Sequence, residues 1–371
     1  MNKAAITKTM RANGKTAKAG RARVYRGTAR NLARLAGVLR EGGIVAVPTE
    51  TVYGLAGDAL NAAACRKIFK AKGRPANDPL IVHIWELAQL NVLAERNEAV
   101  DKVAGAFWPG PLTIVLPKKA VVPDLVTSGR PSVAVRMPRH RMFLELLKRC
   151  GRPLAAPSAN PFGYISPTTA AHVRESLGGK IDFILDGGDA EVGLESTILD
   201  LRDPKNPAVL RPGAISVGEI AKVLGRRVGV VKKIADLEAA GSSGAKVGSG
   251  GGEIAPGMLS KHYSPKTAIT LHRKLSTAVV KALRADEAAV FLFKPAGGEG
   301  KPGTRAGAKA KNVFWLSERG DLRRAARGLF GMLRALDGGQ WKLIHAELAP
   351  GTPDGFAAAI NDRLTRAAAK R

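Results

Sequence analysis

The chain contains more consecutive strand-like runs than a simple alternation of strands and helices can accommodate. Six short apolar runs, bounded by prolines, glycines or polar residues, occur between residues 112 and 213: LTIVLP, SVAVRMP, PLAAPSAN, DFILDGG, STILDLR and AVLRPG. Runs of this length and composition are typical of buried strands. Two earlier runs, at 44–47 and 80–84, extend the series. We therefore predict an α/β fold with a mixed sheet around one core.

Helices are predicted between some of these strands. Residues 31–41 place Leu32, Leu35 and Leu39 on one face, at the spacing of an amphipathic helix, and two glycines follow this segment. Similar patterns predict helices at 63–72, 98–107, 140–149, 168–177 and 216–224.

A change of composition after about residue 226 predicts a second domain. The segment EAAGSSGAKVGSGGGEIAPGM is rich in Gly and Ser, which is typical of a flexible linker. Four further apolar runs then alternate with helices predicted near 275–285, 321–337 and 354–368, the pattern of a small βαβ-type domain. The predicted parts are a basic tail (1–30), a large α/β domain (31–226), a flexible linker or lid (227–266) and a small α/β domain (267–371).

The positive charge of the chain is large and unevenly placed. The net charge is +28, and residues 1–30 carry nine Lys or Arg without any Asp or Glu. Because this segment has few large apolar side chains, we expect it to be disordered. Two explanations of its charge remain open: an arm that binds a polyanion such as RNA, or a tail that only adds solubility.

Composition also bears on the cellular setting. No apolar run approaches the roughly 18 residues that a membrane-spanning helix needs. The two cysteines, Cys65 and Cys150, lack the CxxC spacing of a zinc site and do not form a disulfide framework. We therefore expect a protein of a reducing, cytoplasmic compartment that has no membrane partner and no metal site of its own.

Polar side chains gather at predicted strand ends and loops, where functional sites usually form. Lys and Arg supply positive charge for phosphate oxygens, and Ser, Thr and Asn supply short hydrogen-bonding groups. The chain lacks GxGxxG, GxxxxGK[ST], HExxH and the elbow of a Ser-His-Asp site. This combination favours transfer at a phosphate, in which positioning and charge stabilisation carry the reaction. The clusters are residues 49–54, 70–75, 132–136, 157–169 and 196–213.

Each cluster taken alone also has an ordinary structural explanation. The KAKGR segment, 70–74, has the composition of a solvated helix end. A single histidine in an apolar strand, as at His83, is more often a core residue than a ligand contact. Ser166 followed by Pro167 suits the start of a helix. The order and spacing of all the clusters together decide between these explanations.

Six segments, in order, closely resemble the YrdC-type domain of the long threonylcarbamoyl-AMP synthases: GGIVAVPTETVYGLAGDAL, KAKGRPANDPLIVHI, SVAVRMP, PSANPFGYISPTT, ESTILDL and RPGAI. The resemblance covers about residues 30–225. APGMLSKHYSPKT and the domain after it resemble the C-terminal extension of the long form. The resemblance implies a strongly twisted mixed sheet around a positively charged cavity, a smaller Rossmann-like domain, and a linker that passes over the cavity.

The resemblance also implies a reaction. L-threonine, bicarbonate and ATP, accompanied by Mg²⁺, would give threonylcarbamoyl-AMP and pyrophosphate. A tRNA-modifying complex would then transfer the threonylcarbamoyl group to the adenosine beside the anticodon of certain tRNAs.

Individual residues are assigned by the same resemblance. The expected threonine-binding residues are Thr51, His83, Arg136, Ala156 and Ser196. The expected ATP-binding residues are Lys72, Arg74, Asp78, Ser132, Ser158, Asn160, Ser166, Arg211 and Tyr263. Lys72 and Arg74 are the expected catalytic pair, since their charge would stabilise the departing pyrophosphate. Asp78 stands where several relatives have Asn, and an acid there would weaken contact with ATP or change its dependence on metal.

Two other functions remain open from the sequence. A carbamoyl-adenylating enzyme with a similar domain would carry zinc-finger CxxC pairs, which this chain lacks. An RNA-binding or ribosome-assembly factor would account for the charge but not for six pocket motifs. ATP–pyrophosphate exchange that requires threonine separates all three functions.

Overall fold

The computed structural model describes residues 22–231, 254–256, 263–295, 312–351 and 354–369. In this part the strands of the larger sheet are β1 (Arg23–Arg26), β2 (Val45–Val47), β3 (Gly54–Asp58), β4 (Ile81–His83), β5 (Leu112–Pro117), β6 (Ser132–Arg136), β7 (Leu154–Ala155), β8 (Phe183–Asp186), β9 (Thr197–Asp200), β10 (Ala208–Arg211) and β11 (Gly229–Val230). The helices of the same domain are α2 (Ala29–Arg40), α3 (Ala62–Lys72), α4 (Leu90–Leu93), α5 (Glu98–Phe107), α6 (Asp124–Thr127), α7 (Arg141–Cys150), α8 (Ala170–Leu177) and α9 (Val217–Leu224).

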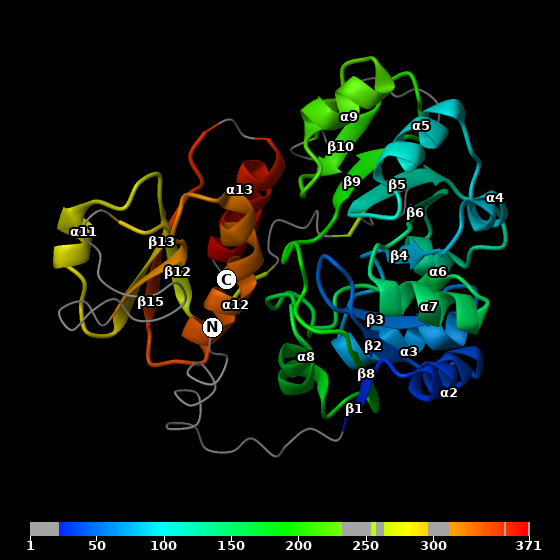
Figure 1. The fold of residues 1–371 in the computed structure, drawn as a ribbon, viewed down its shortest axis with the longest axis horizontal. Coiled ribbons are helices and arrows are strands. Elements are labelled where there is room, and N and C mark those ends of the chain that lie inside the picture. The colour runs from blue at the N-terminus through cyan, green and yellow to red at the C-terminus, as the bar shows by residue number, and fades with distance from the viewer. Residues whose placement is uncertain (1–21, 232–253, 257–262, 296–311, 352–353, 370–371) are drawn as a thin grey trace.

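The smaller domain follows in the chain. Its strands are β12 (Ala268–His272), β13 (Glu287–Phe293), β14 (Val313–Ser317) and β15 (Leu343–Glu347), and its helices are α11 (Thr277–Lys281), α12 (Leu322–Asp337) and α13 (Gly355–Ala368). The four strands are all parallel, in the order β12-β15-β13-β14. Helices α12 and α13 lie between this sheet and the large domain (Figure 1).

The larger sheet is mixed, as predicted, with the order β1-β8-β2-β3-β7-β4-β6-β5-β9-β10-β11. Its centre alternates direction, because β7 runs antiparallel to both β3 and β4, whereas β4 and β6 are parallel. The parallel register pairs His83 with Arg136. The ends of β4 and β6 therefore bring two of the predicted site residues side by side.

The prediction that residues 1–30 are disordered is wrong for the end of this segment, from residue 23 onward. Arg23–Arg26 forms strand β1, which pairs in parallel with β8, and the Thr28 side chain caps helix α2. An edge strand is held by main-chain hydrogen bonds, so its mostly exposed, polar side chains gave no apolar signal. The first 21 residues lie outside the described part, as does most of the predicted linker.

Strand β3 was also not predicted from the sequence. Its residues, GLAGD, include two glycines, which are depleted in strands, yet all five are buried. β3 pairs antiparallel with β2, so the segment 48–53 forms the connection of a hairpin. The polar residues after Pro48 therefore lie in a loop between two buried strands.

The two domains share an apolar core. Val52, Ile165 and Leu194 of the large domain belong to one buried cluster with residues of the small domain, among them Phe330 and Ile360. At the same interface the Tyr164 hydroxyl donates to the Asp337 carboxylate at 2.8 Å. The small domain therefore packs against the large one through both apolar and polar contacts.

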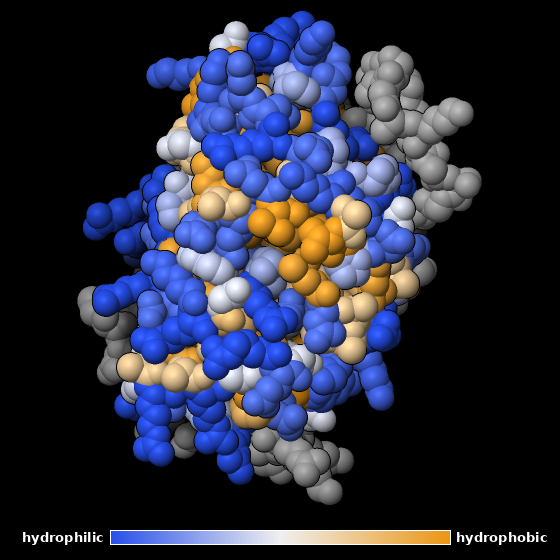
Figure 2. Space-filling model, turned by 90° about the vertical axis from the view of Figure 1, so that its right-hand side faces the viewer, coloured by the Kyte–Doolittle hydropathy of each residue, from blue (hydrophilic) through white to orange (hydrophobic). Residues whose placement is uncertain are grey.

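The face drawn in Figure 2 is mainly hydrophilic. This view looks onto the side of the large domain that faces away from the small one, and its most prominent apolar area lies near the centre. In the described residues, no helix combines the length and apolar character needed to cross a bilayer.

Candidate active site

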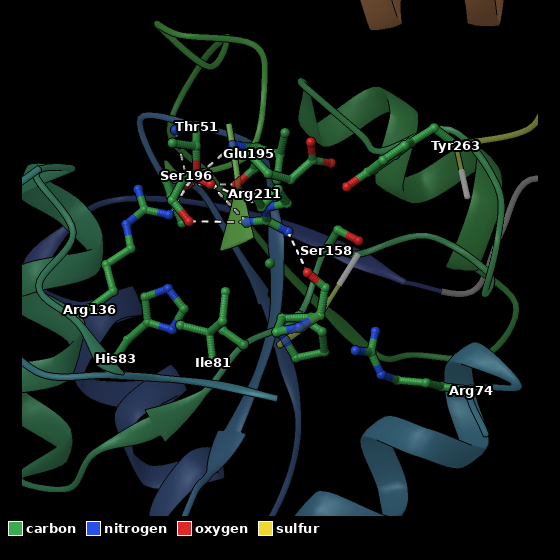
Figure 3. A pocket seen from close by; sticks show the side chains of 16 residues that line it. Thr51, Arg74, Ile81, His83, Arg136, Ser158, Glu195, Ser196, Arg211 and Tyr263 are labelled. Atoms are coloured by element: carbon green, nitrogen blue, oxygen red, sulfur yellow. Dashed lines mark hydrogen bonds between the residues drawn. The ribbon is translucent and has the colours of Figure 1, made fainter. Parts of the chain in front are cut away.

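A pocket opens where the β2–β3 loop meets the ends of several central strands of the larger sheet. It contains all five predicted threonine-binding residues and four of the predicted ATP-binding residues (Figure 3). The lining comprises Thr49, Thr51, Val52, Gly54, Arg74, Ile81, His83, Arg136, Ala156, Pro157, Ser158, Glu195, Ser196, Arg211, Pro256 and Tyr263. Chain segments more than 200 residues apart therefore contribute to one cavity.

Arg136, one of the predicted threonine-binding residues, organises one end of the pocket. Its Nη1 donates to the Thr51 hydroxyl at 2.9 Å, and its Nη2 lies 2.7 Å from the Glu50 carboxylate. Nε donates to the Gly110 carbonyl at 3.1 Å. Because Arg136, Thr51 and Glu50 are all buried, this group holds a guanidinium, paired with a carboxylate, and a hydroxyl at the pocket wall.

His83 is held as a neutral imidazole beside Arg136. Burial, and then the charge of Arg136, lower its pKa to about 3. The ring packs against Phe143, with centroids 5.4 Å apart. Its Nδ1 has no hydrogen-bond partner among the described residues. A neutral ring with an unoccupied nitrogen is a hydrogen-bonding group available to a ligand.

Ser196 and Arg211 lie next to each other in the pocket lining (Figure 3). The Ser196 and Thr113 hydroxyl oxygens are 2.8 Å apart, and Arg211 Nη2 donates to the Ser196 hydroxyl at 3.1 Å. Arg211 Nη1 also donates to the Pro256 carbonyl at 3.0 Å. Pro256 belongs to the predicted linker, so this part of the linker contacts the pocket.

The predicted catalytic pair occupies two different positions. Helix α3 ends at Gly73, which has the left-handed conformation typical of a helix C-terminus (φ 63°), and Arg74 follows it into the pocket lining. Lys72 is not part of the lining. Its ammonium group donates to the carbonyls of Ser158 and Asn160, at 2.5 and 2.6 Å. Burial lowers the pKa of Lys72 well below its usual value.

Arg74 is paired with Asp78 in the buried part of the site. Its Nη2 lies 2.9 Å from the Asp78 carboxylate, and its Nε donates to the Asp78 carbonyl at 2.9 Å. Burial raises the pKa of Asp78, whereas the charge of Arg74 opposes that shift. In this chain the acid at position 78 is therefore the partner of the arginine that lines the pocket.

Three further predicted ATP-binding residues, Asn160, Ser132 and Ser166, are not part of the pocket lining. Asn160 offers its carbonyl to Lys72, and its amide group donates to Tyr164 and Pro161 carbonyls. Ser132 is buried at the start of β6. The Ser166 hydroxyl donates to the Glu195 carboxylate at 2.5 Å. Tyr263 lines the pocket, and burial raises its pKa to about 12.

Two acids in the site were not singled out from the sequence. Glu50 pairs with Arg136, and Glu195 lines the pocket beside Ser196. Both occur inside the quoted segments, within PTET and EST, but an acid in a polar loop has no distinctive pattern. Their partners lie far away in the sequence, so only the fold identifies them. No group of three or more His, Cys, Asp or Glu side chains suited to a metal ion occurs in the described part of the chain.

Comparisons with known proteins agree with this arrangement. A family model described as "Telomere recombination" matches residues 37–213, and one described as "Threonylcarbamoyl-AMP synthase, C-terminal domain" matches residues 215–369. The threonylcarbamoyl-AMP synthase of Pyrococcus abyssi is 42% identical over 344 residues, which cover 91% of this chain and 93% of that protein. The chain belongs to the threonylcarbamoyl-AMP synthase family.

Other members of the threonylcarbamoyl-AMP synthase family support the same architecture. The enzyme of Bacillus subtilis is 37% identical over 342 residues, covering 92% of this chain and 93% of the relative. The crystal structure of Pyrococcus abyssi Sua5 complexed with L-threonine is 37% identical, with a TM-score of 0.78, covering 93% of this chain and 96% of the other. The predicted α/β fold of the family, with its twisted mixed sheet and smaller second domain, is thereby confirmed.

Proposed function

We propose that the pocket forms threonylcarbamoyl-AMP and pyrophosphate from L-threonine, bicarbonate and ATP. The observation that carries the proposal is that Thr51, His83, Arg136, Ala156 and Ser196 line the same cavity as Arg74 and Arg211. Hydroxyls, a neutral imidazole and one guanidinium suit an amino acid with a hydroxyl and a carboxylate. Two further guanidinium groups suit a polyphosphate.

The reaction has two bond-forming steps. The deprotonated amine of threonine attacks the carbon of bicarbonate, and the carbamate forms with release of water. A carbamate oxygen then attacks the α-phosphorus of ATP, and the bond from that phosphorus to the pyrophosphate oxygen breaks. The protein contributes by positioning the reactants and by stabilising the negative charge that moves to pyrophosphate.

Each wall has a separate task in this proposal. Arg136 would bind the threonine carboxylate, with Thr51 and Ser196 beside the hydroxyl. Arg74 would face the departing phosphates, and Lys72 would hold the 158–160 loop against them through its two carbonyl contacts. Glu195 is the only acid in the described pocket lining, so Mg²⁺ would be held mainly by ATP oxygens and water, which is its usual mode with nucleotides.

The test is ATP–pyrophosphate exchange by the purified protein, with and without threonine and bicarbonate. Exchange that requires both supports the proposal. Exchange that proceeds without threonine favours carbamoyl adenylation, and absence of exchange together with tight RNA binding favours an RNA-binding factor. Replacing Arg74 by Ala should reduce exchange by roughly 100-fold, the scale of one charged transition-state contact. Arg66→Ala, on the exposed side of the same helix, is the matched control.

In the cell, the product would serve a tRNA-modifying complex. A mixed anhydride of a carbamate and a phosphate is an activated group donor, so a second protein must consume it before water does. We propose transfer to tRNA, which accords with the basic character of the chain.

A further inference from the structure

The small domain reaches the pocket through one buried arginine. Arg363 lies on helix α13 and is 0% exposed. Its Nε is 2.8 Å from the Glu195 carboxylate, and its Nη2 donates to the Pro212 carbonyl at 3.1 Å. The same guanidinium lies over the Tyr263 ring, with Cζ 5.2 Å from the ring centroid. Arg363 therefore contacts a pocket residue, the residue after Arg211, and the predicted linker.

Glu195 connects this arginine to the predicted ATP site. One carboxylate oxygen accepts from Arg363, and the other accepts from the Ser166 hydroxyl at 2.5 Å. Glu195 is itself part of the pocket lining and is only 7% exposed. Figure 3 shows its carboxylate pointing toward the side of the pocket occupied by Tyr263. The path from α13 to Ser166 thus consists of two short polar contacts.

A negative charge at Glu195 is unfavourable for a site that receives a triphosphate. A buried carboxylate needs a partner, and its field is poorly screened. Arg363 supplies that partner through the only ion pair of Glu195 in the described residues. Arg211 instead donates to the Ser196 and Pro256 carbonyls. Without Arg363, the carboxylate would repel the phosphates or draw Arg211 away from them.

We propose that Arg363 is a positioning residue of the ATP site, through which the small domain neutralises Glu195 and fixes Ser166. The inference rests on the proposed function, because it assumes that this pocket receives ATP. It assigns the small domain a part in substrate binding by the large one. The alternative is that Arg363 only helps to dock the two domains.

A second interdomain contact provides the control for docking. Asp354 of the small domain accepts hydrogen bonds from the main-chain amides of Val217 and Gly218, at 2.7 and 3.1 Å. These amides begin helix α9, and Asp354 does not line the pocket. Asp354→Asn weakens an interdomain contact of similar polarity without changing charge at the ATP site.

The experiment measures the dissociation constant of ATP by calorimetry, in the absence of threonine, and the KM values for ATP and threonine in the exchange assay. Full-length wild type is compared with Arg363→Met, Glu195→Gln, the double variant and Asp354→Asn. Arg363→Met should weaken ATP binding by roughly 10-fold or more, within the usual range of coupling between sites, with a smaller change in the KM for threonine. The double variant should recover most of this loss, because a neutral amide needs no counter-charge.

A docking role alone predicts a different pattern. Arg363→Met and Asp354→Asn would then behave alike, and Glu195→Gln would not restore ATP binding. Either result overturns the inference, as does wild-type ATP affinity in folded Arg363→Met. If Arg363→Met does not fold, the double variant decides: near wild-type ATP binding supports the charge argument, and a loss of roughly 10-fold contradicts it. If ATP–pyrophosphate exchange by the wild type did not require threonine, the proposed function would be contradicted. The comparison of ATP binding among the variants would still test the role of Arg363.

Discussion

Replacing Lys72 by methionine should lower activity without lowering the stability of the ligand-free protein. Lys72 is 2% exposed, and its ammonium group is bound only by two main-chain carbonyls among the contacts described above. Burying an ammonium ion costs several kcal/mol even after relaxation. Methionine removes that cost and fills a similar volume, but it leaves carbonyls without their donor.

The cost of leaving carbonyls without a donor is smaller than the cost of burying the ammonium ion. Ser158 O also accepts from the Asn160 amide at 3.0 Å, so only the Asn160 carbonyl loses its described donor. One orphaned buried group costs about 1–3 kcal/mol. The difference between these two costs predicts that Lys72→Met is as stable as wild type or more stable by about 1–2 kcal/mol. Exchange activity should nevertheless fall by roughly 100-fold.

The stability difference should depend on pH. Burial lowers the folded-state pKa of Lys72, so the unfolded chain holds the proton over a pH range in which the folded chain has lost it. Wild-type stability attributable to this group therefore rises as pH increases toward the unfolded value near 10.5 and is lost as pH falls. The advantage of Lys72→Met should be larger at pH 7 than at pH 10.

Urea denaturation at the two pH values provides the measurement. Lys67→Met is the matched control, since Lys67 lies on the same helix and donates to a carbonyl, Gly42 O at 2.7 Å, from an exposed position. The control should change stability by no more than about 0.5 kcal/mol. A loss of more than about 2 kcal/mol in Lys72→Met would show that its two carbonyl contacts outweigh burial of the charge, and would refute this reasoning.

Three further predictions follow from described contacts. Arg136→Met should destabilise the protein by about 3–5 kcal/mol, because it leaves Glu50 buried and unpaired. Adding Glu50→Gln to the same chain should recover part of this loss in a double-mutant cycle, whereas purely additive effects of the two substitutions would refute the pairing. Because the folded-state pKa of His83 is about 3, the free energy of unfolding of the wild type should fall by roughly 3 kcal/mol relative to that of His83→Gln between pH 7 and pH 4, as measured by denaturation. If the stabilities of the two proteins changed with pH in parallel, the neutral ring would be contradicted. Gly193→Ala should destabilise the protein by roughly 2–4 kcal/mol, because the added Cβ would lie 2.5 Å from the backbone of α12. Gly188 also has a positive φ but has open space around it, so Gly188→Ala should cost only about 1–2 kcal/mol. Equal melting temperatures for the two variants would refute the steric argument.

The sequence predicted well those elements whose signals are local. Helix α5 was predicted with its observed bounds, and α9 within one residue, because an amphipathic face and a cap mark each of them. Ser216 and Glu219 form a capping box at the start of α9, a pattern that needs no tertiary information. The strand β1 was not predicted, since its pairing with β8 joins residues about 160 positions apart.

The same distinction between local and long-range signals applies to the site. Its polar residues were found because they cluster in loops after apolar strands, and their resemblance to a family gave each an expected role. The partners that set their charge were not found: Arg136 is separated from Glu50 by 86 residues, and Glu195 from Arg363 by 168. Local pattern and the family resemblance therefore predict much of the pocket lining, but not which residues lie outside it or how the residues pair. The predicted ATP-binding residues outside the lining are Lys72, Asp78, Ser132, Asn160 and Ser166.

The apolar cluster that crosses the domain boundary has a thermodynamic consequence. Val52, Ile165 and Leu194 complete a core whose other members belong to the small domain, so neither domain can unfold without exposing apolar surface on its neighbour. Two domains coupled in this way melt together. Calorimetry of the whole chain should give one cooperative transition, with a van't Hoff enthalpy close to the calorimetric enthalpy, although the sequence is organised as two folding units.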